Sequence, residues 1–127
     1  MRPHTITYPP DGVEPIGVIE FVHGMCETRN RYAAPMEYFS RRGYICAIAD
    51  MRGHGENILT TDDLGYFGEE GYKGLVNDVQ EYTMYLKREF PNLPFILLGH
   101  SMGSLVVRTY LKKYSQEVDA VILSGSP

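Results

Sequence analysis

A serine flanked by glycines lies where a strand-like segment meets a helix-like segment. Gly99-His100-Ser101-Met102-Gly103 follows an apolar run at residues 94–98 and opens an amphipathic run at 102–114. A Gly-x-Ser-x-Gly pattern in this position predicts a sharp turn that lifts the serine hydroxyl clear of the sheet. Side chains at Gly99 or Gly103 would collide with a neighbouring strand or helix. Ser101 would hold a sparsely populated backbone conformation that costs about 1–3 kcal/mol. The pattern therefore predicts Ser101 as a nucleophile.

Acyl transfer to a serine needs hydrogen-bond donors for the charge that develops on the carbonyl oxygen. In a turn of this type one donor is the backbone N–H after the serine, here that of Met102, and the other comes from the loop after an earlier strand. His23-Gly24-Met25 follows the strand-like run at 16–22, and Gly24 allows a close backbone approach, so the Met25 N–H is predicted as the second donor. Each donor would contribute about 2.7–4 kcal/mol in the transition state. The alternative is that both methionines only fill gaps in the core.

A serine nucleophile also needs a base, and the four histidines are the first candidates. His23 and His100 flank the predicted site, but their positions favour hydrogen bonds that fix loop geometry. His54 lies in a loop at the same edge of the sheet, where it could approach the site or support the loop. His4 is expected to be exposed near the terminus. None of the four follows Ser101 in the chain.

Composition argues against several other classes of function. The 127 residues carry a formal net charge of −4 and no long basic run, which argues against nucleic-acid binding. The N-terminus has no apolar stretch of signal-peptide type and no segment is long enough to span a membrane, so a cytoplasmic location is expected. Cys26 and Cys46 do not make a disulfide framework, and no cysteine–histidine spacing predicts a metal site. No cofactor is expected, because acyl transfer on serine requires none.

The segments around these residues alternate between strands and helices. Apolar runs predict strands at residues 16–22, 44–49, 94–98 and 118–123. Apolar positions three or four apart predict helices at about 33–42, 74–90 and 102–114. Residues 2–8, followed by a turn at 9–12, are predicted to form an edge hairpin arm. This alternation predicts an α/β fold with a parallel sheet covered by helices on both faces.

The chain contains three motifs in succession: His-Gly-Met-Cys-Glu at 23–27, Asp-Met-Arg-Gly-His-Gly at 50–55 and Gly-His-Ser-Met-Gly at 99–103. In this order they resemble the motifs of the α/β-hydrolase superfamily. More narrowly, they resemble its monoacylglycerol lipase and lysophospholipase branch, which is grouped with serine aminopeptidases. The resemblance implies a three-layer sandwich of α/β-hydrolase type that hydrolyses carboxylic esters, with lipid-like monoesters such as monoacylglycerol or lysophospholipid as substrates. It also implies Ser101 as the nucleophile, Met25 and Met102 as oxyanion donors, and a mainly structural loop at 50–55.

The catalytic triad that this resemblance implies is incomplete in the sequence. In the α/β-hydrolase order an acidic residue and then a histidine follow the serine. After Ser101 there is no histidine, and the only acidic residues, Glu117 and Asp119, precede the last predicted strand. We therefore expect residues 1–127 to be the N-terminal part of a single domain, truncated after the strand that follows the nucleophile helix, with the cap and C-terminal part absent. Because loss of the base can lower turnover by on the order of 10⁶, this chain alone is expected to be inactive.

Two other functions stay open from the sequence. One is aminopeptidase-type hydrolysis of amides by the same serine, because the lid region that would separate the two activities is missing. The other is a non-catalytic chain that binds lipid or a protein partner through the remaining half-sheet. An unpaired apolar edge at 121–123 favours self-association or pairing with a missing C-terminal segment. In the catalytic case the expected partner is a small-molecule ester.

Overall fold

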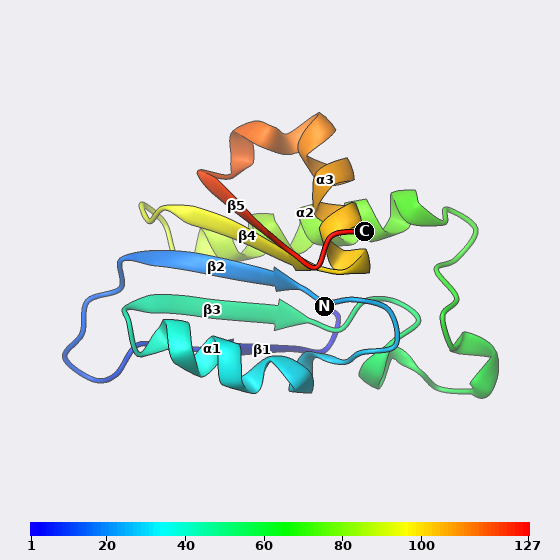
Figure 1. The fold of residues 1–127 in the computed structure, drawn as a ribbon, viewed down its shortest axis with the longest axis horizontal. Coiled ribbons are helices and arrows are strands. Elements are labelled where there is room, and N and C mark those ends of the chain that lie inside the picture. The colour runs from blue at the N-terminus through cyan, green and yellow to red at the C-terminus, as the bar shows by residue number, and fades with distance from the viewer.

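A five-stranded sheet forms the centre of the molecule, in a computed structural model that describes residues 1–127. The strand order is β1-β3-β2-β4-β5. The strands are β1 (His4–Thr7), β2 (Gly17–Val22), β3 (Tyr44–Ala49), β4 (Phe95–His100) and β5 (Ala120–Ser124). The α-helices are α1 (Ala33–Ser40), α2 (Tyr72–Glu89) and α3 (Met102–Tyr114) (Figure 1). None of these helices combines the length and the hydropathy needed to cross a membrane.

Four of the strands pair in parallel, as the alternation of strands and helices predicts. β2 lies between β3 and β4, and β5 pairs with β4. β1 lies at an edge of the sheet, as predicted, but the predicted hairpin is wrong: β1 pairs antiparallel with β3 and not with β2, the strand that follows it in the chain. Both edges of β2 are taken by β3 and β4, so β1 cannot pair with β2 and joins the sheet at the outer edge of β3.

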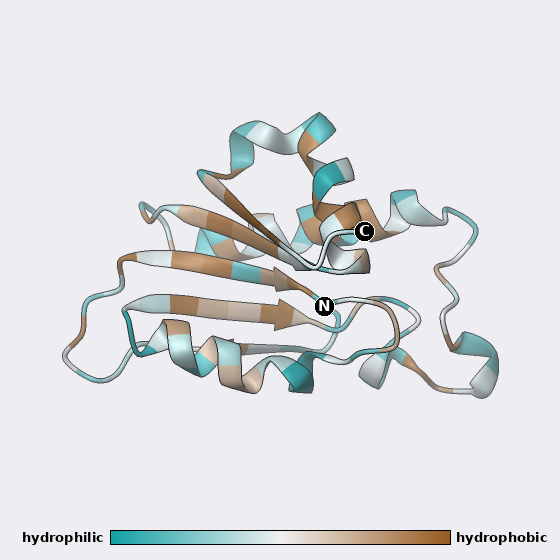
Figure 2. Cartoon of the chain, viewed as in Figure 1, coloured by the Kyte–Doolittle hydropathy of each residue, from teal (hydrophilic) through white to brown (hydrophobic).

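Helices cover both faces of the sheet, as predicted (Figure 1). On one face Val79 of α2 and Val107 of α3 pack with Leu97 of β4 in the larger hydrophobic core. On the other face Met36 of α1 packs with Phe21 of β2 in a smaller core. Figure 2 shows the hydrophobic residues concentrated on the strands between these two layers. The sheet is therefore a central layer packed on both faces, and the loops that follow the carboxyl ends of its strands extend from this layer.

Helix boundaries follow local backbone chemistry. α1 begins at Ala33, and Pro35 is accommodated because it lies in the first turn. The chain leaves this helix through Gly43, whose φ of 103° is a conformation that glycine adopts without steric cost. α2 begins two residues earlier than its periodicity predicts, because Gly71, with φ 59°, turns the chain directly into Tyr72. The bounds predicted for α3 are confirmed.

β5 lies at the edge of the sheet and is largely exposed. It pairs only with β4, and its Ile122 and Leu123 are 40% and 42% exposed. Successive side chains of a strand point to opposite faces, so apolar surface is open on both sides of β5. The predicted unpaired apolar edge is present in the structure.

The first residues of the chain brace the sheet against α2. The Arg2 guanidinium donates to the backbone carbonyl oxygens of Asp50 (3.1 Å) and Asp78 (2.9 Å). His4 Nδ1 lies 2.8 Å from the Tyr82 hydroxyl oxygen, and partial burial lowers the pKa of His4. The expectation that His4 is exposed is wrong, because β1 holds this side chain against α2.

One carboxyl group is buried in the middle of the sheet. Glu20 of β2 is 2% exposed and lies between Ala47 of β3 and Leu97 of β4. The Thr83 hydroxyl donates a hydrogen bond of 2.6 Å to Glu20 Oε1. Burial raises the pKa of Glu20 to about 8, although the Thr83 hydrogen bond acts in the opposite direction. The folded protein therefore holds Glu20 protonated at neutral pH.

Replacing Glu20 by glutamine should remove one pH dependence of stability. The pKa of Glu20 is about 8 in the folded chain and 4.5 for an unperturbed glutamate. Between these two pH values the folded state binds one proton more than the unfolded state, so the free energy of unfolding falls as pH rises. The slope from this group is about 1.4 kcal/mol per pH unit. Urea unfolding at pH 5, 6.5 and 8 should show Glu20→Gln gaining stability over wild type as pH rises. Glu37→Gln, on exposed α1, is the control; identical pH profiles for wild type and Glu20→Gln would refute the assignment.

Candidate active site

The turn between β4 and α3 has the strained geometry that its sequence predicts. Ser101 has φ 55° and ψ −120°, which L-residues rarely adopt. A Cβ built on Gly99 would lie 2.6 Å from the Gly103 carbonyl oxygen, and one on Gly103 would lie 2.0 Å from the Val22 carbonyl oxygen. Neither position has room for a side chain. Gly103 therefore permits the close contact between α3 and β2, and Gly99 permits the contact between the end of β4 and the first turn of α3. The turn has the geometry of a nucleophile elbow.

Backbone hydrogen bonds hold Ser101 in this conformation. Its N–H donates to the Ser124 carbonyl oxygen of β5 (2.9 Å). Its own carbonyl oxygen accepts from the N–H of Ser104 (2.9 Å) and from the Ser104 hydroxyl (2.6 Å). The Ser101 hydroxyl makes no capping hydrogen bond to α3, so it is not tied to its own helix.

The loop after β2 lies directly beside Ser101. A Cβ built on Gly24 would lie 3.1 Å from the Ser101 Cβ, so Gly24 permits the close approach that the sequence predicts. Met25 follows in an exposed turn, with 45% of its surface accessible. Met102, the other predicted donor, is the first residue of α3, where a backbone N–H has no acceptor within the helix. The structure thus brings Ser101, the Met25 loop and the start of α3 together at one edge of the sheet.

The carboxylate of Glu27 fixes the shape of this loop. Glu27 Oε1 accepts hydrogen bonds from the Gly24 N–H (2.6 Å) and from the Tyr32 hydroxyl (2.8 Å). Burial alone would raise the pKa of Glu27, but these two hydrogen bonds bring it below its usual value. An ionised carboxylate therefore closes the turn that contains Met25 and links it to Tyr32.

Two histidines support the same loops through neutral imidazole rings. The Nε2 atom of His23 accepts from the Met51 N–H (2.9 Å), and that of His54 accepts from the Cys26 N–H (3.1 Å). Their Nδ1 atoms lie 2.8 Å from the Gly24 carbonyl oxygen and 3.2 Å from the Arg52 carbonyl oxygen, which assigns the proton to Nδ1 in both rings. Because both nitrogens of each ring are engaged, neither ring is free to serve as the base for Ser101. The predicted loop-fixing role of His23 is confirmed.

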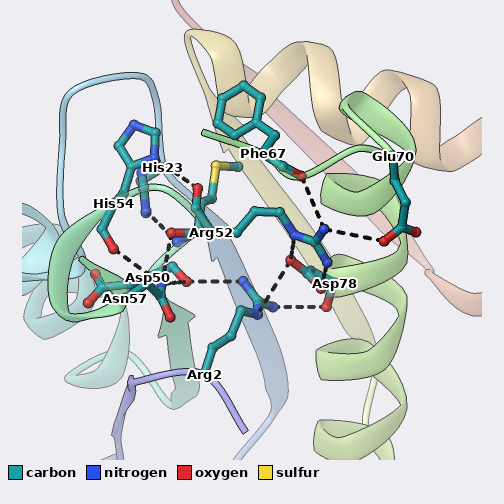
Figure 3. Close-up of polar contacts among 10 residues, drawn as sticks. Arg2, His23, Asp50, Arg52, His54, Asn57, Phe67, Glu70 and Asp78 are labelled. Carbon is teal, nitrogen blue, oxygen red and sulfur yellow. Dashed lines mark hydrogen bonds and ion pairs between the residues drawn. The ribbon is translucent and has the colours of Figure 1, made fainter. Parts of the chain in front are cut away.

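An ion pair joins the loop after β2 to the loop after β3. The fully buried Asp50 carboxylate accepts from the Arg29 guanidinium and from the Arg29 N–H (2.8 Å). It also accepts from the Glu56 N–H (3.1 Å). A Cβ on Gly55 would lie 2.3 Å from the Asp50 carboxylate, so the carboxylate occupies the space of a side chain there. Figure 3 shows Asp50, His23 and His54 grouped where these two loops meet.

Arg52 ties the 50–55 loop to α2. The Arg52 guanidinium donates two hydrogen bonds to the Asp78 carboxylate, of 2.7 and 2.8 Å, and a third of 3.1 Å to the Phe67 carbonyl oxygen (Figure 3). A Cβ on Gly74 would lie 2.3 Å from this guanidinium, which explains a glycine inside α2. The structural role predicted for the 50–55 loop agrees with these contacts.

The remaining polar residues near the motif do not complete a triad. Asp119 Oδ2 accepts from the Phe95 N–H (2.8 Å), and Glu117 pairs with Lys87 (3.1 Å). Phe95 begins β4 and Ser101 follows its end, so both carboxylates lie at the opposite end of the strands from Ser101. His100 Nδ1 lies 3.1 Å from the Ser124 Oγ.

The roles of Glu27 and Asp50 in holding the loops were missed from the sequence. In the sequence Glu27 stands out only as part of the 23–27 motif, and its neighbours do not show that it accepts a hydrogen bond from the Gly24 N–H. The signal that could have found it is a carboxylate placed three residues after a glycine in a turn, where side chains often bond backbone N–H groups.

The family model described as Serine aminopeptidase, S33 matches residues 13–127. A monoacylglycerol lipase of Mycolicibacterium smegmatis is 33% identical over 115 residues, which cover 88% of this chain and 38% of that protein. A Bacillus subtilis protein named phospholipase YtpA is 32% identical over 112 residues, with 87% and 40% covered. The chain thus spans about two fifths of the length of these curated relatives.

Solved structures show the same arrangement of strands and helices. A thermostable carboxyl esterase from Bacillus coagulans, solved in complex with glycerol, superposes with a TM-score of 0.87 at 29% identity and covers 94% of this chain and 38% of its own. A soluble variant of the Saccharomyces cerevisiae monoglyceride lipase superposes with a TM-score of 0.80 at 24% identity, covering 97% of this chain and 40% of its own. The predicted fold class is confirmed. Together, the matched family model, the relatives and the superpositions show that the chain belongs to the serine aminopeptidase (S33) family of α/β-hydrolases.

Proposed function

We propose that this chain carries the nucleophile half of a serine hydrolase that cleaves carboxylic esters through an acyl-enzyme. The observation that supports this most is the strained Ser101 turn, with the Met25 loop packed against it. The substrate class is a small-molecule ester, in particular a lipid-like monoester such as a monoacylglycerol or a lysophospholipid. Relatives named monoacylglycerol lipase, phospholipase and lysophospholipase support this substrate class.

In the proposed reaction the Ser101 Oγ forms a bond to the ester carbonyl carbon as its proton passes to a base. The negative charge moves to the carbonyl oxygen, where the N–H groups of Met25 and Met102 donate hydrogen bonds to it. The α3 N-terminus adds a positive dipole end at the same point. Collapse of this intermediate breaks the bond to the alcohol, which leaves with the proton. Water then attacks the Ser101 ester and releases the acid.

The base and the acid that orients it are proposed to come from residues beyond position 127. His23 and His54 are occupied by backbone hydrogen bonds, and Glu117 and Asp119 lie at the far edge of the sheet. In this proposal residues 1–127 are the N-terminal part of a single hydrolase domain. A following segment would supply the triad partners and cover the exposed edge of β5.

Amide hydrolysis by the same nucleophile is the second candidate. The family description names an aminopeptidase, and a relative from Saccharolobus solfataricus named proline iminopeptidase is 30% identical over 91 residues. Those residues cover 65% of this chain and 28% of that protein. The elbow and its donors would serve an ester or an amide carbonyl equally, so substrate assays must decide between the two.

The 127-residue chain should hydrolyse p-nitrophenyl esters no faster than its Ser101→Ala variant, because no base reaches the serine. A longer product of the same gene that supplies an acidic residue and a later histidine should hydrolyse monoacylglycerol. That product should lose on the order of 10⁶ in turnover on Ser101→Ala. A fluorophosphonate probe should label the longer product covalently at Ser101, and it should label neither the 127-residue chain nor the Ser101→Ala variants.

Two results would contradict these proposals. Rapid ester hydrolysis by residues 1–127 that disappears in Ser101→Ala would show that the chain contains its own base. A longer product that cleaves aminoacyl anilides but not esters would assign the amide reaction instead.

Glu27 should act as a positioning residue for the Met25 donor. In Glu27→Ala the Gly24 N–H and the Tyr32 hydroxyl lose their acceptor, so amide hydrogen exchange at residues 24–26 should accelerate. In the longer product, loss of one oxyanion donor should lower turnover by about 10²–10³ with little change in KM. Glu37→Ala, on the exposed side of α1, is the matched control. Unchanged exchange at residues 24–26 would remove Glu27 from this role.

A further inference from the structure

A groove runs between α2 and α3, from Met102 at the start of α3 toward the last turn of that helix. It consists of two adjoining hollows, of about 220 Å³ and about 450 Å³, that share Tyr72, Val76 and Thr109 as lining residues. Both helices are anchored beneath it by a hydrogen bond of 2.6 Å from the Tyr110 hydroxyl to Gln80 Oε1. The groove is therefore built on fixed elements of the fold.

One end of the groove is apolar. Seven of the eight residues that line the smaller hollow are hydrophobic, among them Phe67, Met102 and Leu105. Leu105 is 40% exposed and Tyr72 is 62% exposed, although other residues of both helices are fully buried in the core. Exposed apolar side chains are common singly, but a group that faces one concave surface is typical of a binding site.

The other end is positively charged. Lys73, Lys112 and Lys113 line the larger hollow, and none of its eight lining residues is acidic. None of the three lysines forms an ion pair in the structure, whereas Arg2, Arg29 and Arg52 each have a carboxylate partner. This cluster stands out in a chain whose net charge is −4.

Helix electrostatics accounts for only part of this cluster. Lys112 and Lys113 lie in the last turn of α3, where cations complement the helix dipole. Lys73 lies in the first turn of α2, where the dipole disfavours a cation, and that turn contains no acidic residue. Lys73 is therefore poorly placed for the stability of its own helix and well placed to attract an anion.

We propose that this groove binds a long-chain fatty acid anion. The hydrocarbon chain would lie in the apolar hollow between Phe67, Met102 and Leu105, and the carboxylate would lie beside Lys73 and Lys112. A single apolar chain with one anionic end matches a groove that changes from hydrophobic to basic along its length. Figure 2 shows this change along α3, whose first half is largely hydrophobic and whose second half is more hydrophilic. Met102, at the apolar end, follows Ser101 directly, whereas Lys112 and Lys113 lie in the last turn of α3. The proposal rests on the lining and the charge of the groove and not on the proposed function.

Titration of the 127-residue chain with ¹³C-carboxyl-labelled dodecanoate, below its micelle concentration, tests the proposal. Saturable binding is expected, with amide shifts confined to α2, α3 and residue 67. Leu105→Gln and the pair Lys73→Gln with Lys112→Gln should each raise the Kd by about tenfold or more. Leu59→Gln, at an 88% exposed position outside the groove, and Arg88→Gln, an exposed cation near the end of α2, are the matched controls and should leave the Kd unchanged.

Two further measurements test the role of the carboxylate charge and separate this groove from the serine of the elbow. Dodecanol should bind more weakly than dodecanoate, because it lacks the charge that the lysines recognise. Ser101→Ala should bind dodecanoate as wild type does, which distinguishes this site from any acylation at the elbow. Absence of saturable binding, equal loss in the control variants, or dimerisation through this face that Leu105→Gln abolishes would each overturn the proposal.

Discussion

The contact between the first turn of α3 and the end of β2 governs the structure of the candidate site. Gly103 lies so close to the Val22 carbonyl oxygen that no Cβ fits between them. This approach fixes the exit of β4 and holds Ser101 in a backbone conformation that costs about 1–3 kcal/mol elsewhere. Because β2 also carries the Met25 loop, the same contact sets the position of the serine relative to that loop. Packing over both faces of the sheet stabilises an arrangement that the local backbone alone would not adopt.

Polar contacts at the carboxyl edge of the sheet serve a different purpose from the packing beneath them. The loops after β2 and β3 have few backbone partners of their own, and buried N–H groups must be satisfied. His23, Asp50 and His54 supply the acceptors, each reaching from one loop to the other. A histidine accepts only when neutral, and an aspartate accepts best when ionised. The loops are thus joined by three side chains, each of which accepts a hydrogen bond from a backbone N–H of the other loop.

Much of the fold could be predicted from the sequence, because hydrophobic periodicity and the glycine pattern are local properties. The strand at 44–49 and the helix at 102–114 match their predicted ranges, and the elbow geometry follows from Gly99 and Gly103. The pairing of β1 could not be predicted, because the turn at 9–12 is a local feature whereas the free edge of β3 is set by the whole sheet. The support given by Asp50 was also beyond the sequence, since its partner Arg29 is defined only once the loops meet.

The hydrogen bonds of the Arg2 side chain join segments that lie far apart in the sequence. This side chain reaches Asp50 and Asp78, which are 48 and 76 residues away in sequence, and Asp78 in turn holds Arg52. Such contacts cannot form until β3 and α2 have both docked on the sheet, and closing long loops is slow relative to forming local structure. The contacts that tie the 50–55 loop to Arg2 and α2 therefore depend on both dockings. A truncated peptide that carries the loop sequence alone would retain the motif but lose the shape on which the Ser101 site depends.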